Sequence, residues 1–131
     1  MVNSKQKGNR YERECVDWLN QVFESVFKPI GVGIKNKVAH RTPRSGGFAT
    51  QTGWGKFSGD AFTSVRVGDQ EVKFDFKFYK KLGIFKFWNK HKKECSPQDI
   101  PVLIIHANNE IDHLVVMERN DWSQLVEKAV K

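Results

Sequence analysis

The chain has 131 residues, enough for one domain with a hydrophobic core and too few for two ordinary domains. Hydrophobic residues make up 39% and aromatic residues 12% of the sequence, which excludes a disordered tail. The formal net charge of +7 favours polyanionic partners, with nucleic acid first among them.

Cys15 and Cys95 each lie within an apolar helical pattern, which predicts buried free thiols in a reducing compartment. No spacing typical of a metal site links the four histidines, which are His40, His91, His106 and His113. The N-terminus is polar and basic, and no apolar run approaches the roughly 20 residues needed to span a bilayer. We therefore expect no membrane association and a cytoplasmic protein, or one in the host-cell cytoplasm if it is viral.

The N-terminal segment predicts a helix from about residue 4 to about residue 27, before Pro29. On a helical wheel Glu12 falls inside the apolar stripe, whereas Glu14 falls outside it. A carboxylate directed at a core is costly unless a cation or a donor meets it. Glu12 is therefore a candidate functional acid, although a position at the edge of the stripe, near the helix start, is the alternative.

A glycine-broken connection leads to a predicted strand at residues 37–42 and then to a long loop. The beginning of this loop combines two arginines, a hydroxyl group and paired glycines in residues 41–47. Such a segment can grip phosphate groups, and its length without predicted secondary structure favours a function over an ordinary surface loop.

A second strand is predicted at residues 62–67, followed by a turn at residues 68–70 and a central strand at residues 71–79. The central strand alternates strictly between apolar and polar residues, so Asp75 and Lys77 share one face. Asp60 precedes the neighbouring strand, and hairpin geometry can bring it close enough to Asp75 to share a metal ion. A solvated strand face and a simple turn aspartate are the alternatives.

The C-terminal part predicts a helix at residues 84–95 with outward-facing Lys86, Lys90 and Lys93 and an exposed Phe87. A second hairpin is expected from residues 101–106 and 111–117, with the run 102–105 buried on both faces, and a final helix begins near Asp121. The element order α-β-β-β-α-β-β-α predicts an α/β fold, a single domain over residues 1–131 with a mixed central β-sheet flanked by helices.

Taken together, these motifs resemble the PD-(D/E)xK nuclease superfamily, and more closely its archaeal-type and viral Holliday junction resolvases. The resemblance lies in the segment Lys7-Gly8-Asn9-Arg10-Tyr11-Glu12-Arg13-Glu14, in Arg41-Thr42-Pro43-Arg44-Ser45-Gly46, and in an acid before a hairpin followed by Asp-x-Lys on the next strand. It covers most of the first 95 residues. Gly59 replaces the usual proline before the acid, and Asp75 replaces the more common glutamate.

The resemblance implies a restriction-endonuclease-like αβββαβ core and a Mg²⁺-dependent endodeoxyribonuclease, with Mn²⁺ as an alternative ion. It assigns Glu12, Asp60 and Asp75 as metal ligands and catalytic residues, and Lys77 as the catalytic lysine. The residues expected to contact DNA are Lys7, Arg10, Arg41, Arg44 and Ser45. It further implies a homodimer that cleaves branched DNA at four-way junctions. A nuclease of the same superfamily that acts on flaps, ends or duplex DNA, and a non-catalytic DNA-binding module, are the alternatives.

Overall fold

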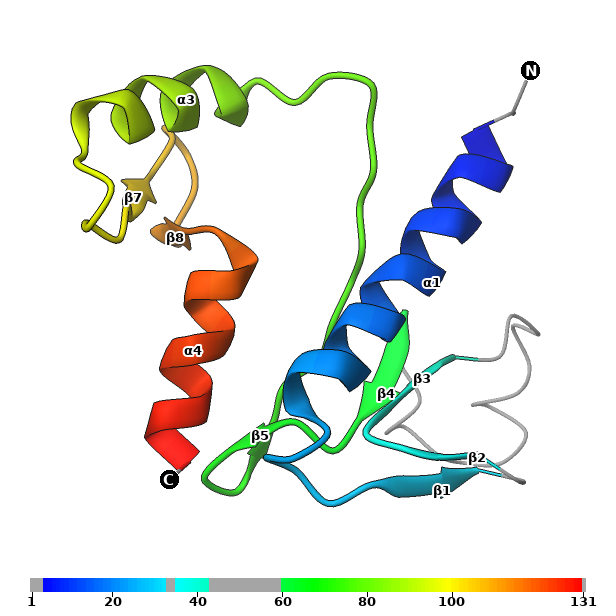
Figure 1. The fold of residues 1–131 in the computed structure, drawn as a ribbon. Helices are drawn as coiled ribbons and strands as arrows, with labels where there is room; N and C mark the ends of the chain where they lie inside the picture. The colour runs from blue at the N-terminus through cyan, green and yellow to red at the C-terminus, as the bar shows by residue number, and fades with distance from the viewer. Residues whose placement is uncertain (1–3, 33–34, 43–59, 131) are drawn as a thin grey trace. The chain divides into compact units, whose positions relative to one another are not determined.

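The computed structural model describes residues 4–32, 35–42 and 60–130 (Figure 1). This part of the chain contains three helices and four antiparallel strand pairs, a mixed α/β fold consistent with the PD-(D/E)xK architecture. The chain divides into two compact units, Met1–Phe78 with Ala129–Lys131 and Tyr79–Lys128, and each is described by itself.

In the first unit, helix α1 spans Ser4–Phe23 and buries one apolar face. Four residues at helical spacing form this face, namely Cys15, Val16, Leu19 and Phe23. The regular helix ends earlier than the predicted residue 27, because the amide groups of Val26 and Phe27 both bond to the carbonyl of Phe23 in a tighter final turn.

The helix is followed by a hairpin that the sequence analysis did not predict, β1 (Ile30–Val32) paired with β2 (Lys35–Lys37). The predicted strand at residues 37–42 is interrupted after β2, and β3 (Ala39–Arg41) pairs with β4 (Ala61–Thr63). Buried His40 lies in β3, where its ring stacks on Phe62 and its Nε2 lies 2.8 Å from the carbonyl oxygen of Ile30. His40 is therefore part of the core.

The hairpin turn predicted at residues 68–70 is present, with β5 (Arg66–Val67) paired with β6 (Gln70–Glu71). Gly68 has a φ of 61° at the turn, a left-handed conformation that glycine adopts readily. The prediction of a continuous strand over residues 71–79 is wrong, because beyond β6 the described residues show only a single bridge, between Phe74 and Ala61. Within the described residues the ladder ends at this bridge, so regular pairing does not extend over the alternating residues that follow.

Helix α1 lies beside β3, and a pair of hydrogen bonds joins them (Figure 1). Asn20 Nδ2 donates to the carbonyl of Ala39 over 3.0 Å, and the amide of Ala39 donates to Asn20 Oδ1 over 2.9 Å. The core between helix and strands is completed by Val38, Ala39, Ala61, Phe62 and Val65, all buried. This contact fixes the position of the helix relative to the strands that hold the candidate site.

The second unit contains α3 (Ile84–Glu94), the hairpin of β7 (Leu103–Ile105) and β8 (Leu114–Val116), and α4 (Arg119–Val130). Helix α4 begins two residues before the predicted start, because the Glu118 carboxylate accepts a hydrogen bond from the amide of Asn120 and caps the helix. Ile104 is 67% exposed, so the expected burial of residues 102–105 on both faces is not seen.

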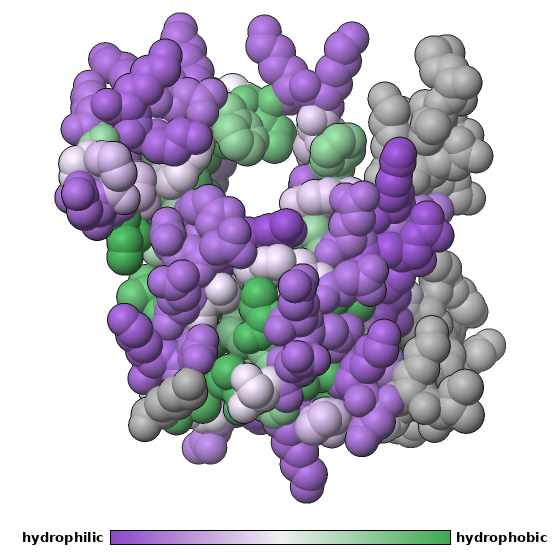
Figure 2. Space-filling view, in the orientation of Figure 1, coloured by the Kyte–Doolittle hydropathy of each residue, from purple (hydrophilic) through white to green (hydrophobic). Residues whose placement is uncertain are grey.

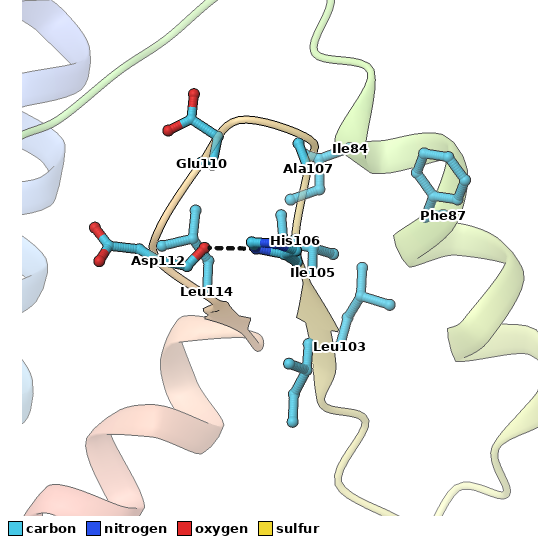
Figure 3. Close-up of a pocket in the computed structure, with 10 residues that line it drawn as sticks. Ile84, Phe87, Leu103, Ile105, His106, Ala107, Glu110, Asp112 and Leu114 are labelled. Carbon is cyan, nitrogen blue, oxygen red and sulfur yellow. Dashed lines mark hydrogen bonds between the residues drawn. The ribbon is translucent and has the colours of Figure 1, made fainter.

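A pocket of about 820 Å³ lies between α3 and the β7–β8 hairpin, with mostly apolar residues around it (Figure 3). His106 in this pocket bonds to the carbonyl of Asp112, and its ring stacks on His113 with centroids 4.1 Å apart. Both cysteines are free, as predicted, with Cys15 buried and Cys95 half-buried. Among the described helices none is both long and apolar enough to cross a membrane.

Candidate active site

Asp60 lies where β4 begins, and its backbone is held on both sides by neighbouring strands. The amide of Thr42 donates to the carbonyl of Asp60 over 3.1 Å, and the amide of Asp60 donates to the carbonyl of Phe74 over 3.0 Å. The carboxylate in turn accepts a 2.6 Å bond from the amide of Phe76. These three bonds place the acid directly against the segment that contains Asp75.

The carboxyl groups of Asp60 and Asp75 lie close enough together that each changes the pKa of the other. Partial burial raises the pKa of Asp60, and the neighbouring charges of Asp75 and Glu12 raise it further, against the opposing effect of the Phe76 amide. The hydrogen bond from Asp60 lowers the pKa of Asp75, and Lys77 lowers it further. The pair therefore binds its first proton on Asp60 and keeps Asp75 ionised.

Lys77 lies beside this pair, with Nζ 3.1 Å from Asp75 Oδ2. Both side chains are more than half exposed, so solvent reaches the ammonium and the carboxylate. The prediction that Asp75 and Lys77 project from the same side is confirmed by this contact. A similar pair precedes it, in which Lys73 Nζ lies 3.2 Å from Glu71 Oε1.

Glu12 and Arg41 form a half-buried ion pair, with Arg41 Nη2 2.8 Å from Glu12 Oε2. Arg41 lies at the end of β3, opposite Ala61 and next to the position of Asp60. The side chain of Glu12 is only 12% exposed, whereas Glu14 is exposed, so the helical phase predicted for the two acids is correct. A donor that meets Glu12 is the guanidinium group of Arg41, a pairing that the sequence analysis did not predict.

Of the other residues proposed from the sequence, Arg10 is the one whose side chain is described. Arg10 is exposed on α1. Arg44 and Ser45 fall outside the described residues, as does Gly59, and only the backbone of Lys7 is described, within α1. Within the described ranges no three His, Cys, Asp or Glu side chains are grouped closely enough to hold a metal ion.

The donor set of Asp60 and Asp75 nevertheless suits a hard divalent cation. Two neighbouring carboxylates, one of them partly buried, have one lysine beside them among the described residues, and this leaves one negative charge of the pair in excess there. Carboxylate oxygens are the ligands that Mg²⁺ and Mn²⁺ prefer, and a bound cation would relieve the repulsion that raises the pKa of Asp60.

Two positioning groups were missed by the sequence analysis. The Phe76 amide orients the Asp60 carboxylate, and Asn20 fixes α1 to β3 two helical turns after Glu12. Asn20 lies at the border of the apolar stripe of α1, and an amide side chain in that position is the signal that could have identified it. The hydrogen bond from the Phe76 amide could not be predicted from the sequence, because a backbone donor does not depend on the side chain at that position.

Comparison with known proteins gives one family. The family model described as "Phage putative PDDEXK endonuclease" matches residues 3–131, which is nearly the whole chain. Neither the curated proteins nor the solved structures gave a significant match. The match extends through the acids and the lysine described above, in the order Glu12, Asp60, Asp75 and Lys77. The chain therefore belongs to this phage family of PD-(D/E)xK endonucleases.

Proposed function

We propose that this protein is a metal-dependent DNA endonuclease whose reaction centre consists of Asp60, Asp75 and Lys77. The main support is the approach of Asp60 to the segment that contains Asp75. The Phe76 amide lies 2.6 Å from Asp60 Oδ2, and Lys77 Nζ lies 3.1 Å from Asp75 Oδ2. The family match over residues 3–131 supports both the class of reaction and the treatment of residues 1–131 as one nuclease domain. A phage family is also consistent with action in the host-cell cytoplasm.

The cation, Mg²⁺ or alternatively Mn²⁺, would be held by Asp60 and Asp75, and it would supply Lewis-acid stabilisation of the scissile phosphate and an activated water molecule. Lys77 orients Asp75 and places a positive charge where negative charge develops on the phosphate. The Phe76 amide prevents the Asp60 carboxylate from rotating away from Asp75. Each of these groups lies on a single segment, residues 74–77, or is bonded to it.

Glu12 and Arg41 form the second part of the proposed site. Glu12 is proposed as a third acidic group of the metal site, and Arg41 as a contact of the DNA phosphate next to it. Their 2.8 Å ion pair keeps both side chains near Asp60, whose pKa the charge of Glu12 raises. The remaining proposed DNA contacts are Lys7, Arg10, Arg44 and Ser45, which belong to the motifs shared with junction resolvases.

For the substrate, we infer branched DNA, cleaved as a four-way junction by a homodimer. The support is the resemblance of the two basic motifs to those of Holliday junction resolvases, in the segments 7–14 and 41–46. A junction offers two equivalent phosphates related by a two-fold axis, and a C₂ dimer has two sites related in the same way. Flaps, ends and linear duplex are the alternative substrates within the family.

A cleavage panel tests the substrate. The protein, with its mass in solution measured in parallel, is incubated with Mg²⁺ and a fixed four-way junction, a flap, a linear duplex of matching sequence and a single strand. Paired symmetrical nicks confined to the junction, made by a dimer, are the expected result. A monomer that cuts linear duplex as fast as the junction would contradict the junction assignment and leave a general nuclease.

Two lysine variants test the reaction centre with a matched control. Lys77→Gln is expected to reduce the cleavage rate about a hundredfold or more, a loss typical of removing a group that stabilises developing charge. Lys73→Gln removes the equivalent ammonium from the preceding pair, with Glu71, and should leave the rate nearly unchanged. Equal losses of cleavage rate in both variants would show that only the overall charge matters and that Lys77 has no specific role at the reaction centre.

A further inference from the structure

Helix α3 presents one continuous exposed face that the proposed reaction centre does not use. The face consists of two rows at i, i+4 and i+7 spacing, Lys86-Lys90-Lys93 and Phe85-Asn89-Lys92. All six residues are exposed, and we call them the basic face of α3. Figure 2 shows hydrophilic atoms gathered over α3 in this view.

The charge of this face is only slightly compensated within the helix. Residues 79–93 contain six lysines and no acidic residue, and the one acid of α3 is its last residue, Glu94, four positions after Lys90. None of these lysines has an ion-pair partner within the described part of the chain. Lys86 lies in the first turn, where the helix dipole disfavours a cation, and no acid is present there to compensate. Lys92 and Lys93 lie in the last turn, where a cation interacts favourably with the helix dipole. Helix stability therefore accounts for lysine at these two positions but not for lysine at position 86.

Like charges also repel each other within the row. Lys86 and Lys90 are neighbours at i, i+4, and Lys90 and Lys93 at i, i+3, arrangements that destabilise an isolated helix. A polyanion laid along the face would remove this repulsion and would release condensed counterions. The regular row of ammonium groups thus fits a phosphate backbone better than it fits a simple solvated surface.

Phe85 is the one apolar side chain on the basic face, and it is 52% exposed. The other exposed aromatic residue of the helix, Phe87, lines the pocket between α3 and the β7–β8 hairpin and lies outside the basic face (Figure 3). Phe85 does not line that pocket. An exposed aromatic ring beside lysines is the combination that binds unpaired bases, because the ring stacks on a base while the ammonium groups bind its phosphates.

We propose that the basic face of α3 binds DNA with single-stranded character, with Lys86, Lys90 and Lys93 on the phosphates and Phe85 stacked on an unpaired base. The inference rests on the proposed DNA-cleaving function and names the feature of the substrate that this surface recognises. Branch points and single-stranded flaps expose such bases, whereas intact duplex does not.

The charge part of the proposal is tested by the salt dependence of binding, measured by fluorescence anisotropy in the presence of chelator so that no cleavage occurs. The triple variant Lys86→Gln/Lys90→Gln/Lys93→Gln should lower the slope of log K against log salt by about 2 for single strands, at roughly 0.7 per phosphate contact. The control Lys28→Gln/Lys37→Gln/Lys128→Gln removes the same charge from exposed positions elsewhere and should lower it by less than half as much. Equal slopes in the two triple variants would overturn the assignment.

The stacking part is tested with substitutions at one position. Phe85→Leu should weaken binding to oligothymidine about tenfold, within the range measured for loss of one base–aromatic stack, and should leave duplex binding unchanged. Phe85→Trp should restore the affinity, with its fluorescence quenched by the oligonucleotide. Equal losses on single-stranded and duplex DNA, or no loss at all, would overturn the stacking role.

These results are separable from the proposed catalytic function. If wild-type protein cleaves DNA with Mg²⁺ and the α3 variants bind DNA as their controls do, only the proposed DNA-binding role of the basic face is refuted. Protein that binds through α3 and shows no cleavage with Mg²⁺ or Mn²⁺ would overturn the proposed nuclease activity and leave this surface supported. Binding of wild-type protein to anionic vesicles without binding to any DNA would overturn the surface as a DNA site.

Discussion

Substitution of Asp60 is expected to separate stability from activity, because the structure gives its carboxylate two distinct roles. The carboxylate accepts a 2.6 Å hydrogen bond from the Phe76 amide, and it is in like-charge contact with Asp75. Asparagine retains an oxygen that can accept the amide bond and removes the negative charge. Alanine removes both. Either change should abolish metal-dependent cleavage, whereas only alanine should destabilise the fold.

The magnitude follows from the hydrogen bond. A bond to a charged acceptor contributes about 1.5–3 kcal/mol when buried, and we take about 1–2 kcal/mol for this half-exposed group. For a chain of this length that change corresponds to a decrease in Tm of about 4–8 °C for Asp60→Ala. Asp60→Asn should show no loss of stability in metal-free protein at neutral pH.

The sign of the pH dependence provides a second check on the same variants. Because the native pKa of Asp60 is raised, the native state binds this proton more tightly than the unfolded chain. The stabilisation is complete below the ordinary aspartate pKa and is lost as pH rises through the raised value. In that window the free energy of unfolding of metal-free wild type should therefore fall relative to Asp60→Asn.

Thermal and urea unfolding in chelator measure these differences, with Asp69→Ala as the control in the exposed turn of the β5–β6 hairpin. The control should change the free energy of unfolding by less than about 0.5 kcal/mol. Equal destabilisation by Asp60→Asn and Asp60→Ala would refute the role of the Phe76 bond. A gap between wild type and Asp60→Asn that widens in favour of wild type as pH rises would refute the raised pKa.

Three further predictions concern Glu12, Asn20 and Lys86. Glu12→Gln should reduce the single-turnover cleavage rate by about a hundredfold, as for a group in direct or near contact with a metal. The control Glu14→Gln should leave the rate nearly unchanged. Similar losses in the two variants would mean that the burial of Glu12 has no functional meaning. Asn20→Ala should lower the free energy of unfolding by about 2 kcal/mol in urea titrations, because the Ala39 amide loses its acceptor and the Ala39 carbonyl loses its donor. The control Asn89→Ala, at an exposed position of α3, should change the free energy of unfolding by less than about 0.5 kcal/mol. Lys86→Gln should raise the Tm of DNA-free protein slightly, since it removes a cation from the first turn of α3, and a clear decrease would contradict the repulsion described for that face.

Elements with strong local signals were predicted well from the sequence. The helical period placed α3 within one residue of its observed bounds, and the Gly68-Asp69 turn marked the β5–β6 hairpin. The same period separated Glu12 from Glu14 correctly, because burial on a helix depends mainly on angle around its axis. The approach of Asp60 to Asp75 was also foreseen, since a short hairpin leaves few alternatives for its register.

Features that depend on distant partners were not predicted. The bond between Arg41 and Glu12 joins residues 29 positions apart, and no local pattern indicates it. Strict alternation over residues 71–79 indicates a strand only where a neighbouring strand is available, and the described ladder extends no further than the bridge at Phe74. The β1–β2 hairpin was missed because glycine at position 31 was interpreted as a break, although Gly31 pairs with Asn36 within the ladder.

Cleavage of the panel of junction, flap, duplex and single-stranded DNA by Asp75→Asn, compared with Glu71→Gln, tests the central claim most directly. Both variants neutralise a carboxylate that pairs with a lysine two residues later on the same segment, and only Asp75 contacts Asp60. With Mg²⁺ or Mn²⁺, we predict that wild type and Glu71→Gln cleave the junction and that Asp75→Asn cleaves none of the substrates. Chelator should stop cleavage by the first two proteins. Undiminished cleavage by Asp75→Asn, or cleavage by wild type in excess chelator, would contradict a metal-dependent reaction at this pair of carboxylates.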